Sequence, residues 1–195
     1  SDGWVRLRGL QYSYPVRIAY RRLLLHAIAA TATLLMVFPD LPPWLPIGWA
    51  VALAAMLFCS LRLDWRLADV DRRPIARWEV WLHTLLSGVI ALLWGVPILI
   101  FSRYGPPGDI YAIWGVQAML LAAVALWLAP VLLGAWLIIL LLGSSAIVAL
   151  SMGHHFEMAC IAVSFTAMAL AGSRKGAHQY LAGRIAEVGF AEKQE

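Results

Sequence analysis

The sequence predicts an all-α, polytopic membrane protein with six transmembrane helices and with both ends of the chain in the cytoplasm. Three observations support this fold class. Hydrophobic residues make up 62% of the 195-residue chain, against about 45–50% in a soluble domain. Only 13% of the residues are charged, which is about half the usual share. Fourteen of the fifteen Lys and Arg residues fall in three clusters that apolar segments separate.

The three basic clusters set the predicted orientation. Their members are Arg6, Arg8, Arg17, Arg21 and Arg22; then Arg62, Arg66, Arg72, Arg73 and Arg77; then Arg174, Lys175, Arg184 and Lys193. Loops rich in Lys and Arg stay in the cytoplasm, so the number of spans between neighbouring clusters must be even. We therefore expect a multi-pass protein of the bacterial inner membrane, with its N-terminus, second loop and C-terminus inside.

The first two spans are predicted at residues 23–38 and 47–61. Four prolines in residues 39–46 separate them, because proline cannot continue a helix. The segment 62–77 follows as a cytoplasmic loop of mixed charge.

The other four spans follow from the distribution of charge. Span three is predicted at 80–101. Residues 110–156 contain no Asp, Glu, Lys or Arg, which leaves room for two spans of roughly 20 residues each. We place these spans at 110–129 and 130–150, with Pro130 in a first helical turn, where its missing N–H is tolerated. Span six is predicted at 154–172.

The last segment, 173–195, is polar and helix-forming, and we expect it to be a cytoplasmic juxtamembrane helix. Leu181, Ile185 and Val188 are spaced by four and then three residues, which is the pattern of a heptad seam. This seam predicts a signal-transmission helix in a homodimer. The charged end, with no Gly or Pro to stop the helix, leads us to expect a further domain downstream. The predicted organisation is an N-terminal segment (1–22), a six-helix membrane domain (23–172) and a linker helix (173–195).

A group of possible ligand-binding side chains lies at the predicted outer end of spans five and six. Its members are Met152, His154, His155, Glu157 and Met158. Thioethers favour Cu(I) and imidazole suits copper or zinc, while histidine can also act as a pH switch. On a helix, His154 would lie next to Glu157 and Met158. The alternative is a polar patch that caps span six.

His26 and His83 form a second candidate site. Each is predicted a few residues inside the cytoplasmic edge of its span, and two histidines at equal depth could ligate a haem. Polar groups inside a bilayer suggest a function, although neutral histidines also form hydrogen bonds between helices. No acidic residue is predicted deep in a span, so the sequence indicates no proton or ion path.

Residues 184–195, Arg-Ile-Ala-Glu-Val-Gly-Phe-Ala-Glu-Lys-Gln-Glu, resemble the linker that follows membrane-integral sensor regions in proteobacterial GGDEF/EAL proteins. The six-span layout likewise resembles the MASE-type sensor domains of that family. The resemblance implies a sensory domain that is covalently linked to a cytoplasmic enzyme making or degrading cyclic di-GMP. No GGDEF or EAL catalytic motif occurs in this chain, so the resemblance implies no catalytic residue within the 195 residues.

Two other classes of function remain open. The chain could be the sensor domain of a histidine kinase or nucleotide cyclase, or it could be a self-contained transporter, haem- or metal-binding protein or membrane enzyme. The basic residues flank apolar segments and form no stripe with interleaved aromatics, so we expect the lipid bilayer and not nucleic acid as partner.

Overall fold

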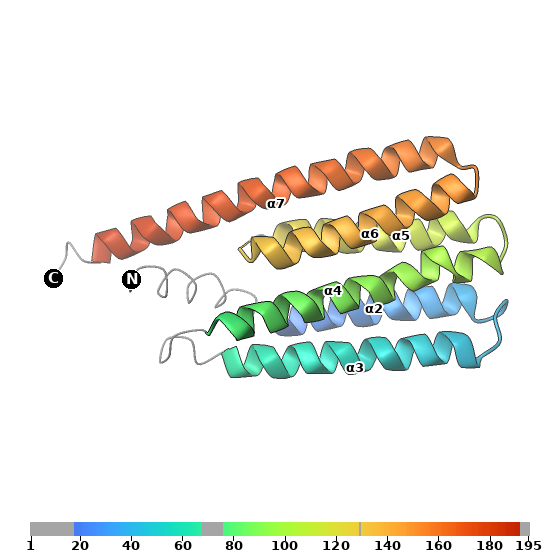
Figure 1. Cartoon of the computed structure of the whole chain (residues 1–195), viewed down its shortest axis with the longest axis horizontal. Coiled ribbons are helices and arrows are strands. Elements are labelled where there is room, and N and C mark those ends of the chain that lie inside the picture. The colour runs from blue at the N-terminus through green and yellow to red at the C-terminus, as the bar shows by residue number, and fades with distance from the viewer. Residues whose placement is uncertain (1–17, 68–75, 129, 192–195) are drawn as a thin grey trace.

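The computed structural model describes residues 18–67, 76–128 and 130–191. These residues form six α-helices and one short 3-10 helix, and they contain no strand. The helices are α2 (Ala19–Val37), α3 (Trp44–Leu67), α4 (Arg77–Leu99), η1 (Phe101–Arg103), α5 (Asp109–Trp127), α6 (Leu132–Met152) and α7 (Phe156–Ala191). They lie side by side in one elongated bundle (Figure 1).

Each of the six described α-helices is long and apolar enough to cross a membrane, which confirms the predicted all-helical class and agrees with six candidate spans. The start of α2 and the end of α7 lie at the same end of the bundle, which we name the terminal end (Figure 1). The α2–α3, η1–α5 and α6–α7 connections lie at the other end, which we name the hairpin end. The location of the terminal end in the cytoplasm stays a prediction.

The helices form a closed ring. Around it, α2 packs on α3, α3 on α4, α4 on α6, α6 on α7, α7 on α5 and α5 on α2, while α5 also contacts α6 and α4 across the bundle. Helices α3 and α7 lie on opposite sides (Figure 1). The apolar stretches of α2, α3 and α7 are the least buried in the bundle, so these three helices leave the largest share of their residues on its outer surface.

Small residues bring α4 and α6 close together. A Cβ added to Gly95 would lie 3.4 Å from the Ser145 Cβ, and one added to Gly134 would lie 3.6 Å from the Ser87 Oγ. A Cβ on Gly88 would overlap the Leu137 side chain at 2.8 Å. Lipid is as apolar as a leucine side chain, so close backbone packing of this kind is a main source of helix association in a membrane.

Several helix boundaries differ from the prediction: α2, α3 and α4 begin three or four residues earlier than predicted, and α3 includes Pro46 in its first turn. Two other differences have a clear cause. Span two was predicted to end at Leu61, but α3 continues to Leu67 and carries Arg62 and Asp64 with it. Arg62 lies over the Phe58 ring, with its Cζ 5.0 Å from the ring centroid, and Asp64 pairs with a residue of α2. These contacts let a helix continue through charged residues. Helix α6 begins at Leu132, so Pro130 precedes the first turn instead of occupying it.

Helix α7 runs without interruption through the regions predicted as span six and as the linker. Figure 1 shows it extending past the other helices at the terminal end. Leu181 is half-buried; the side chains of Ile185 and Val188 lie outside the described part, so the heptad seam stays a prediction. Most of the predicted N-terminal segment (1–17) and residues 68–75 of the second loop also lie outside the described residues.

Pro97 lies inside α4, two residues before its end. Proline has no N–H, so the Leu93 carbonyl four residues earlier lacks its helical donor. The indole N–H of Trp49 on α3 donates to this carbonyl at 2.7 Å. The Trp49 ring also packs edge-on against Trp94 and Phe101. Trp49 therefore holds α3 against the point where α4 loses a backbone hydrogen bond.

We expect Trp49→Phe to destabilise the protein by about 1–3 kcal/mol, because it leaves a buried carbonyl without a donor. The loss should shrink in a Pro97→Ala background, where residue 97 regains an N–H that can reach Leu93. Unfolding curves for the double-mutant cycle measure the difference. Trp114→Phe is the matched control, since the Trp114 indole is buried and packs edge-on against Phe165 without a hydrogen bond among the described residues. If Trp49→Phe lowered the stability equally in both backgrounds, the role of Trp49 as the donor that replaces the missing N–H of Pro97 would be contradicted.

Candidate functional site

A buried ion pair joins the first two helices near the terminal end. The guanidinium of Arg22, in the first turn of α2, donates a hydrogen bond to a carboxylate oxygen of Asp64 near the end of α3. The Arg22 side chain is 14% exposed and the Asp64 side chain 2%. The second Asp64 oxygen lies 4.0 Å from the Nε2 atom of His83 on α4. Desolvated charges need such partners, because an unpaired charge in an apolar environment is very costly.

A small cavity of about 50 Å³ adjoins this pair. Its polar lining comes from Arg22, His26, Ser60, Asp64 and Ser87, and the rest of its wall is apolar. The Arg22 Nε and Asp64 Oδ1 atoms have no hydrogen-bond partner within the described residues. A polar space of this size has room for one or two water molecules.

Trp94 connects this region to the middle of the bundle. Its indole N–H donates to the Nδ1 atom of His26 at 3.0 Å, and its backbone carbonyl accepts from the Nε2 atom of Gln117 on α5 at 2.7 Å. The His26 and Trp94 rings also stack, with centroids 5.9 Å apart. One buried tryptophan on α4 therefore binds both α2 and α5 through hydrogen bonds.

This arrangement gives no support to a haem between His26 and His83. The Nδ1 atom of His26 accepts from Trp94, and the His83 ring lies beside Asp64. The cavity that His26 lines holds about 50 Å³, which is far too small for a porphyrin. The geometry fits the alternative interpretation, in which His26 forms hydrogen bonds between helices.

A larger cavity of about 410 Å³ lies at the hairpin end. Residues from α4, η1, α5, α6 and the turn before α7 form its wall, and Arg103 is the only charged residue among them. Arg103 donates to the Sδ atom of Met152 at 3.4 Å. The Nδ1 atom of His155 lies 2.7 Å from the Tyr111 hydroxyl. We call this space the hairpin cavity; its volume is in the range typical of small-molecule sites.

The turn that closes the hairpin cavity is a Schellman motif. The His155 N–H donates to the Leu150 carbonyl at 2.9 Å, and the His154 N–H donates to the Ser151 carbonyl at 3.1 Å. In a Schellman motif, the first residue after the helix cap has a left-handed backbone. His154 occupies this position, with a φ of 60°. Glycine or asparagine usually occupies this position, and a left-handed conformation costs most other residues roughly 1–2 kcal/mol.

The five residues predicted to bind a metal do not all face the same site in the structure. Met152 and His155 line the hairpin cavity. The His154 ring is exposed and lies near Phe156, with centroids 6.0 Å apart. Glu157 is exposed and Met158 is half-buried against the core. The described part of the chain contains no group of three or more His, Cys, Asp or Glu side chains that could hold a metal ion.

The expected helical spacing of His154 with Glu157 and Met158 is wrong. Span six was predicted to start at His154, but α7 starts at Phe156 and His154 belongs to the turn. The i,i+3 and i,i+4 relations hold only within a helix. The proximity of His155 to Tyr111, which comes from a different helix, could not be read from spacing.

Sequence reasoning missed the Arg22–Asp64 pair and the hairpin cavity's Arg103. Arg22 and Asp64 were assigned to cytoplasmic segments, but the structure places both in helices, with Asp64 buried three residues before the end of α3. A signal was present, because Leu61, Leu63 and Leu67 would continue an apolar helix past Arg62. Arg103 also stood out as the one basic residue outside the three clusters.

Comparison with known proteins identifies no family. No protein-family model matches the chain, no curated protein matches it, and no solved structure matches it. The fold and site therefore define a class only: a six-helix bundle of membrane-spanning dimensions with a small-molecule-sized cavity at one end and a buried ion pair toward the other.

Proposed function

We propose that this chain is a membrane-integral sensory domain in which α7 carries a change at the hairpin cavity to the terminal end. The observation that supports this proposal is the position of α7. Met152, Gly153 and His155 line the cavity immediately before α7 begins. The helix then continues for 36 residues and extends past its neighbours at the opposite end (Figure 1).

A helix of this length is a rigid connection of roughly 54 Å, at about 1.5 Å per residue. A ligand that binds one arrangement of the α6–α7 turn better than another shifts the population toward that arrangement. The left-handed His154 gives the turn a strained residue, and stored backbone strain is a feature of sites that switch between states. A change there moves the start of α7 and, through the helix, its far end.

The output lies beyond the terminal end in this proposal. The three basic clusters favour a cytoplasmic terminal end in the bacterial inner membrane. The resemblance of residues 184–195 to the linkers of GGDEF/EAL proteins favours an enzyme of cyclic di-GMP metabolism as the output. Leu181, Ile185 and Val188 would form the dimer seam through which α7 acts.

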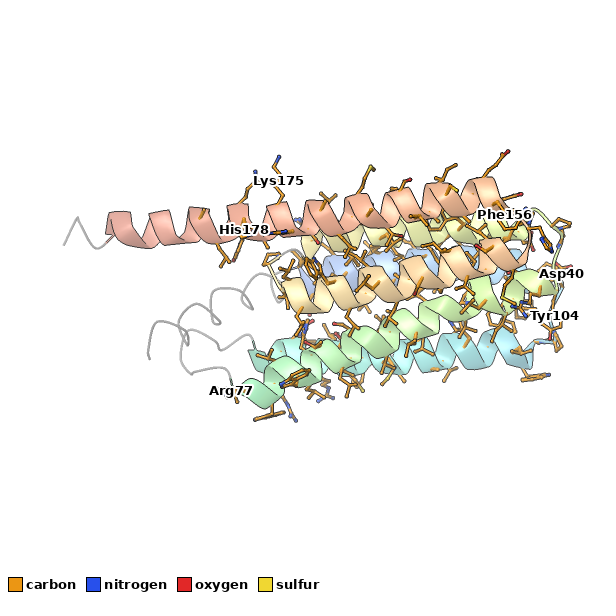
Figure 2. All side chains as sticks on the ribbon, turned by 45° about the horizontal axis from the view of Figure 1, so that its top comes forward. Asp40, Arg77, Tyr104, Phe156, Lys175 and His178 are labelled. Carbon is orange, nitrogen blue, oxygen red and sulfur yellow. The ribbon has the colours of Figure 1, made fainter. Side chains whose placement is uncertain are left out.

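Distance measurements across the terminal end test whether the turn and the far end of α7 are coupled. Spin labels are placed at Arg77→Cys and His178→Cys, which Figure 2 shows toward the terminal end and which are both exposed. The two native cysteines, Cys59 and Cys160, are exposed and are replaced by alanine. The labelled protein is reconstituted in nanodiscs.

Gly153→Ala is the perturbation. A Cβ at Gly153 would lie 2.8 Å from the His155 ring, so the turn must rearrange. We expect the label distance to change by about 1–2 Å, the usual size of a helix shift in switching proteins. Gly108→Ala, also at the hairpin end, is the matched control because its Cβ would meet nothing within 4 Å. An unchanged distribution in folded Gly153→Ala protein would overturn the proposed coupling.

A further inference from the structure

We infer that the hairpin cavity binds a small organic anion, in which a carboxylate or phosphonate-type group is attached to a short apolar part. This inference rests on the proposed sensory function and names the ligand class of its site. The charge of the wall gives the first argument. Asp40, Asp109 and Glu157 also lie at the hairpin end, but none of them lines the cavity, where Arg103 is the only charged side chain.

Arg103 has donors to spare. A guanidinium carries five N–H donors, and the contact found here is one bond from its Nη2 atom to the Met152 thioether, which is a weak acceptor. No carboxylate of the described residues forms an ion pair with Arg103. The planar fork of an arginine matches the two oxygens of a carboxylate or phosphonate group better than any neutral partner.

His155 supplies a second donor to the same space. Its Nδ1 atom faces the Tyr111 hydroxyl at 2.7 Å. When that hydroxyl donates, Nδ1 is the acceptor and the proton of a neutral imidazole resides on Nε2. The Nε2 edge lies at the cavity wall, since a Cβ on Gly153 would be 3.3 Å from it. In that tautomer, the Arg103 guanidinium and the His155 Nε2–H are two donors from different elements.

The rest of the wall limits the size and polarity of the ligand. Ile98, Pro107, Ile110 and Ala149 give it an apolar surface, and the Ser102 hydroxyl is already used as a donor to the Ile98 carbonyl at 2.5 Å. A space of about 410 Å³ accommodates a molecule of several heavy atoms. An acidic lipid headgroup is also an anion and therefore shares this chemistry. Such a headgroup would be close to the cavity, because the hairpin end lies where a membrane surface would be.

Binding of four-carbon probes to the full chain in nanodiscs tests the inference. The probes are butyrate, butylphosphonate, butanol and butylammonium, and binding is read by saturation-transfer NMR and by the shift in unfolding temperature. In nanodiscs of zwitterionic lipid we expect the two anions to bind and the alcohol and the cation not to. Arg103→Gln should weaken anion binding by roughly tenfold or more, as expected for the loss of hydrogen bonds to a charged group.

Arg174→Gln is the matched control, because Arg174 is an exposed arginine on α7 outside the cavity and its loss should leave anion binding unchanged. Gly153→Val, whose side chain would displace the His155 ring from the cavity wall, is a second variant expected to abolish binding. If only phosphatidylglycerol stabilises the wild type, and Arg103→Gln removes that effect, the anion site is correct and its occupant is a lipid headgroup.

Three results would overturn the inference: equal binding of butanol or butylammonium, anion binding unaffected by Arg103→Gln, or no binding of any anion or acidic lipid. The label distances of the sensory proposal are measured without a ligand. A failure of anion binding therefore leaves the α7 coupling standing, and a failure of coupling leaves the anion site standing.

Discussion

Replacing Asp64 by leucine is expected to destabilise the protein by about 3 kcal/mol, because Arg22 then retains a largely buried charge without its carboxylate. Breaking a fully buried pair costs roughly 3–5 kcal/mol. We expect the lower end of that range because the Arg22 side chain is still 14% exposed. Reversible unfolding in mixed detergent micelles, followed by far-UV circular dichroism, measures the loss.

The double variant Arg22→Met/Asp64→Leu should recover most of this stability, since it removes both charges and leaves apolar side chains of similar size. Asp40→Leu is the matched control, because Asp40 is exposed in the α2–α3 connection and should change stability by no more than about 0.5 kcal/mol. If the double variant were as unstable as Asp64→Leu, the charge would not be the cause, and side-chain packing around α3 would have to explain the loss.

The second large effect is expected at Gly143, where α6 meets α7. A Cβ at this position would overlap the Oγ1 and Cγ2 atoms of Thr166 and would lie 3.0 Å from its Cβ. Thr166 is buried and its hydroxyl donates to the Ala162 carbonyl at 2.7 Å, so its side chain cannot turn aside freely. We expect Gly143→Ala to destabilise the protein by about 1–3 kcal/mol through overpacking, and Gly143→Leu to push α7 away from α6.

Unfolding curves give the loss for Gly143→Ala, and the Arg77/His178 label pair gives the movement of α7 in Gly143→Leu. Gly115→Ala on α5 is the control, since its Cβ would meet nothing within 4 Å; it should be neutral or stabilise the helix by up to about 1 kcal/mol. Thr166→Ala should rescue Gly143→Ala because it removes the overlapping atoms. Failure of this rescue would show that another contact limits the approach of the two helices.

The contacts between α6 and α7 limit how α7 can move. Near the terminal end, the Trp136 indole N–H of α6 donates to the Ser173 hydroxyl of α7 at 3.1 Å, and Ser173 is fully buried. Gly143 and Thr166 bring the same two helices together further along the bundle. Helix α7 is thus held at two levels along α6, while its start depends on the turn at the hairpin cavity. Movement of α7 in the sensory proposal must be a shift against these contacts.

The helical spans were predictable from the sequence to within a few residues, because the hydropathy of a segment depends on its own composition. The largest boundary error was at the end of α3, and its cause was a partner from another helix. Arg62 and Asp64 read as loop residues when they are taken alone. They are compatible with a helix only because Arg62 lies over the Phe58 ring and Asp64 is neutralised by Arg22.

The sequence predicted where the candidate site lies, but it did not predict which residues form its wall. Histidines 154 and 155 and Met152 drew attention to the α6–α7 turn, and two of these three residues line the hairpin cavity. The wall residues Ile98, Ser102, Arg103, Pro107 and Ile110 come from α4, η1, the loop before α5 and α5, and they are separated from the turn by more than 40 positions in the sequence. No periodicity within one helix indicates which of its side chains will face a distant turn.

The six apolar helices of the described residues follow from composition alone, because each segment carries enough apolar residues to be buried in lipid and a buried backbone there satisfies its hydrogen bonds within its own helix. Which helices become neighbours depends on how they pack in three dimensions. That packing pairs Arg22 with Asp64, directs Trp49 to the carbonyl that Pro97 leaves without a donor, and brings Arg103 and His155 to one cavity. These contacts join residues far apart in the chain, so their energies depend on the packing of the whole bundle and not on local composition.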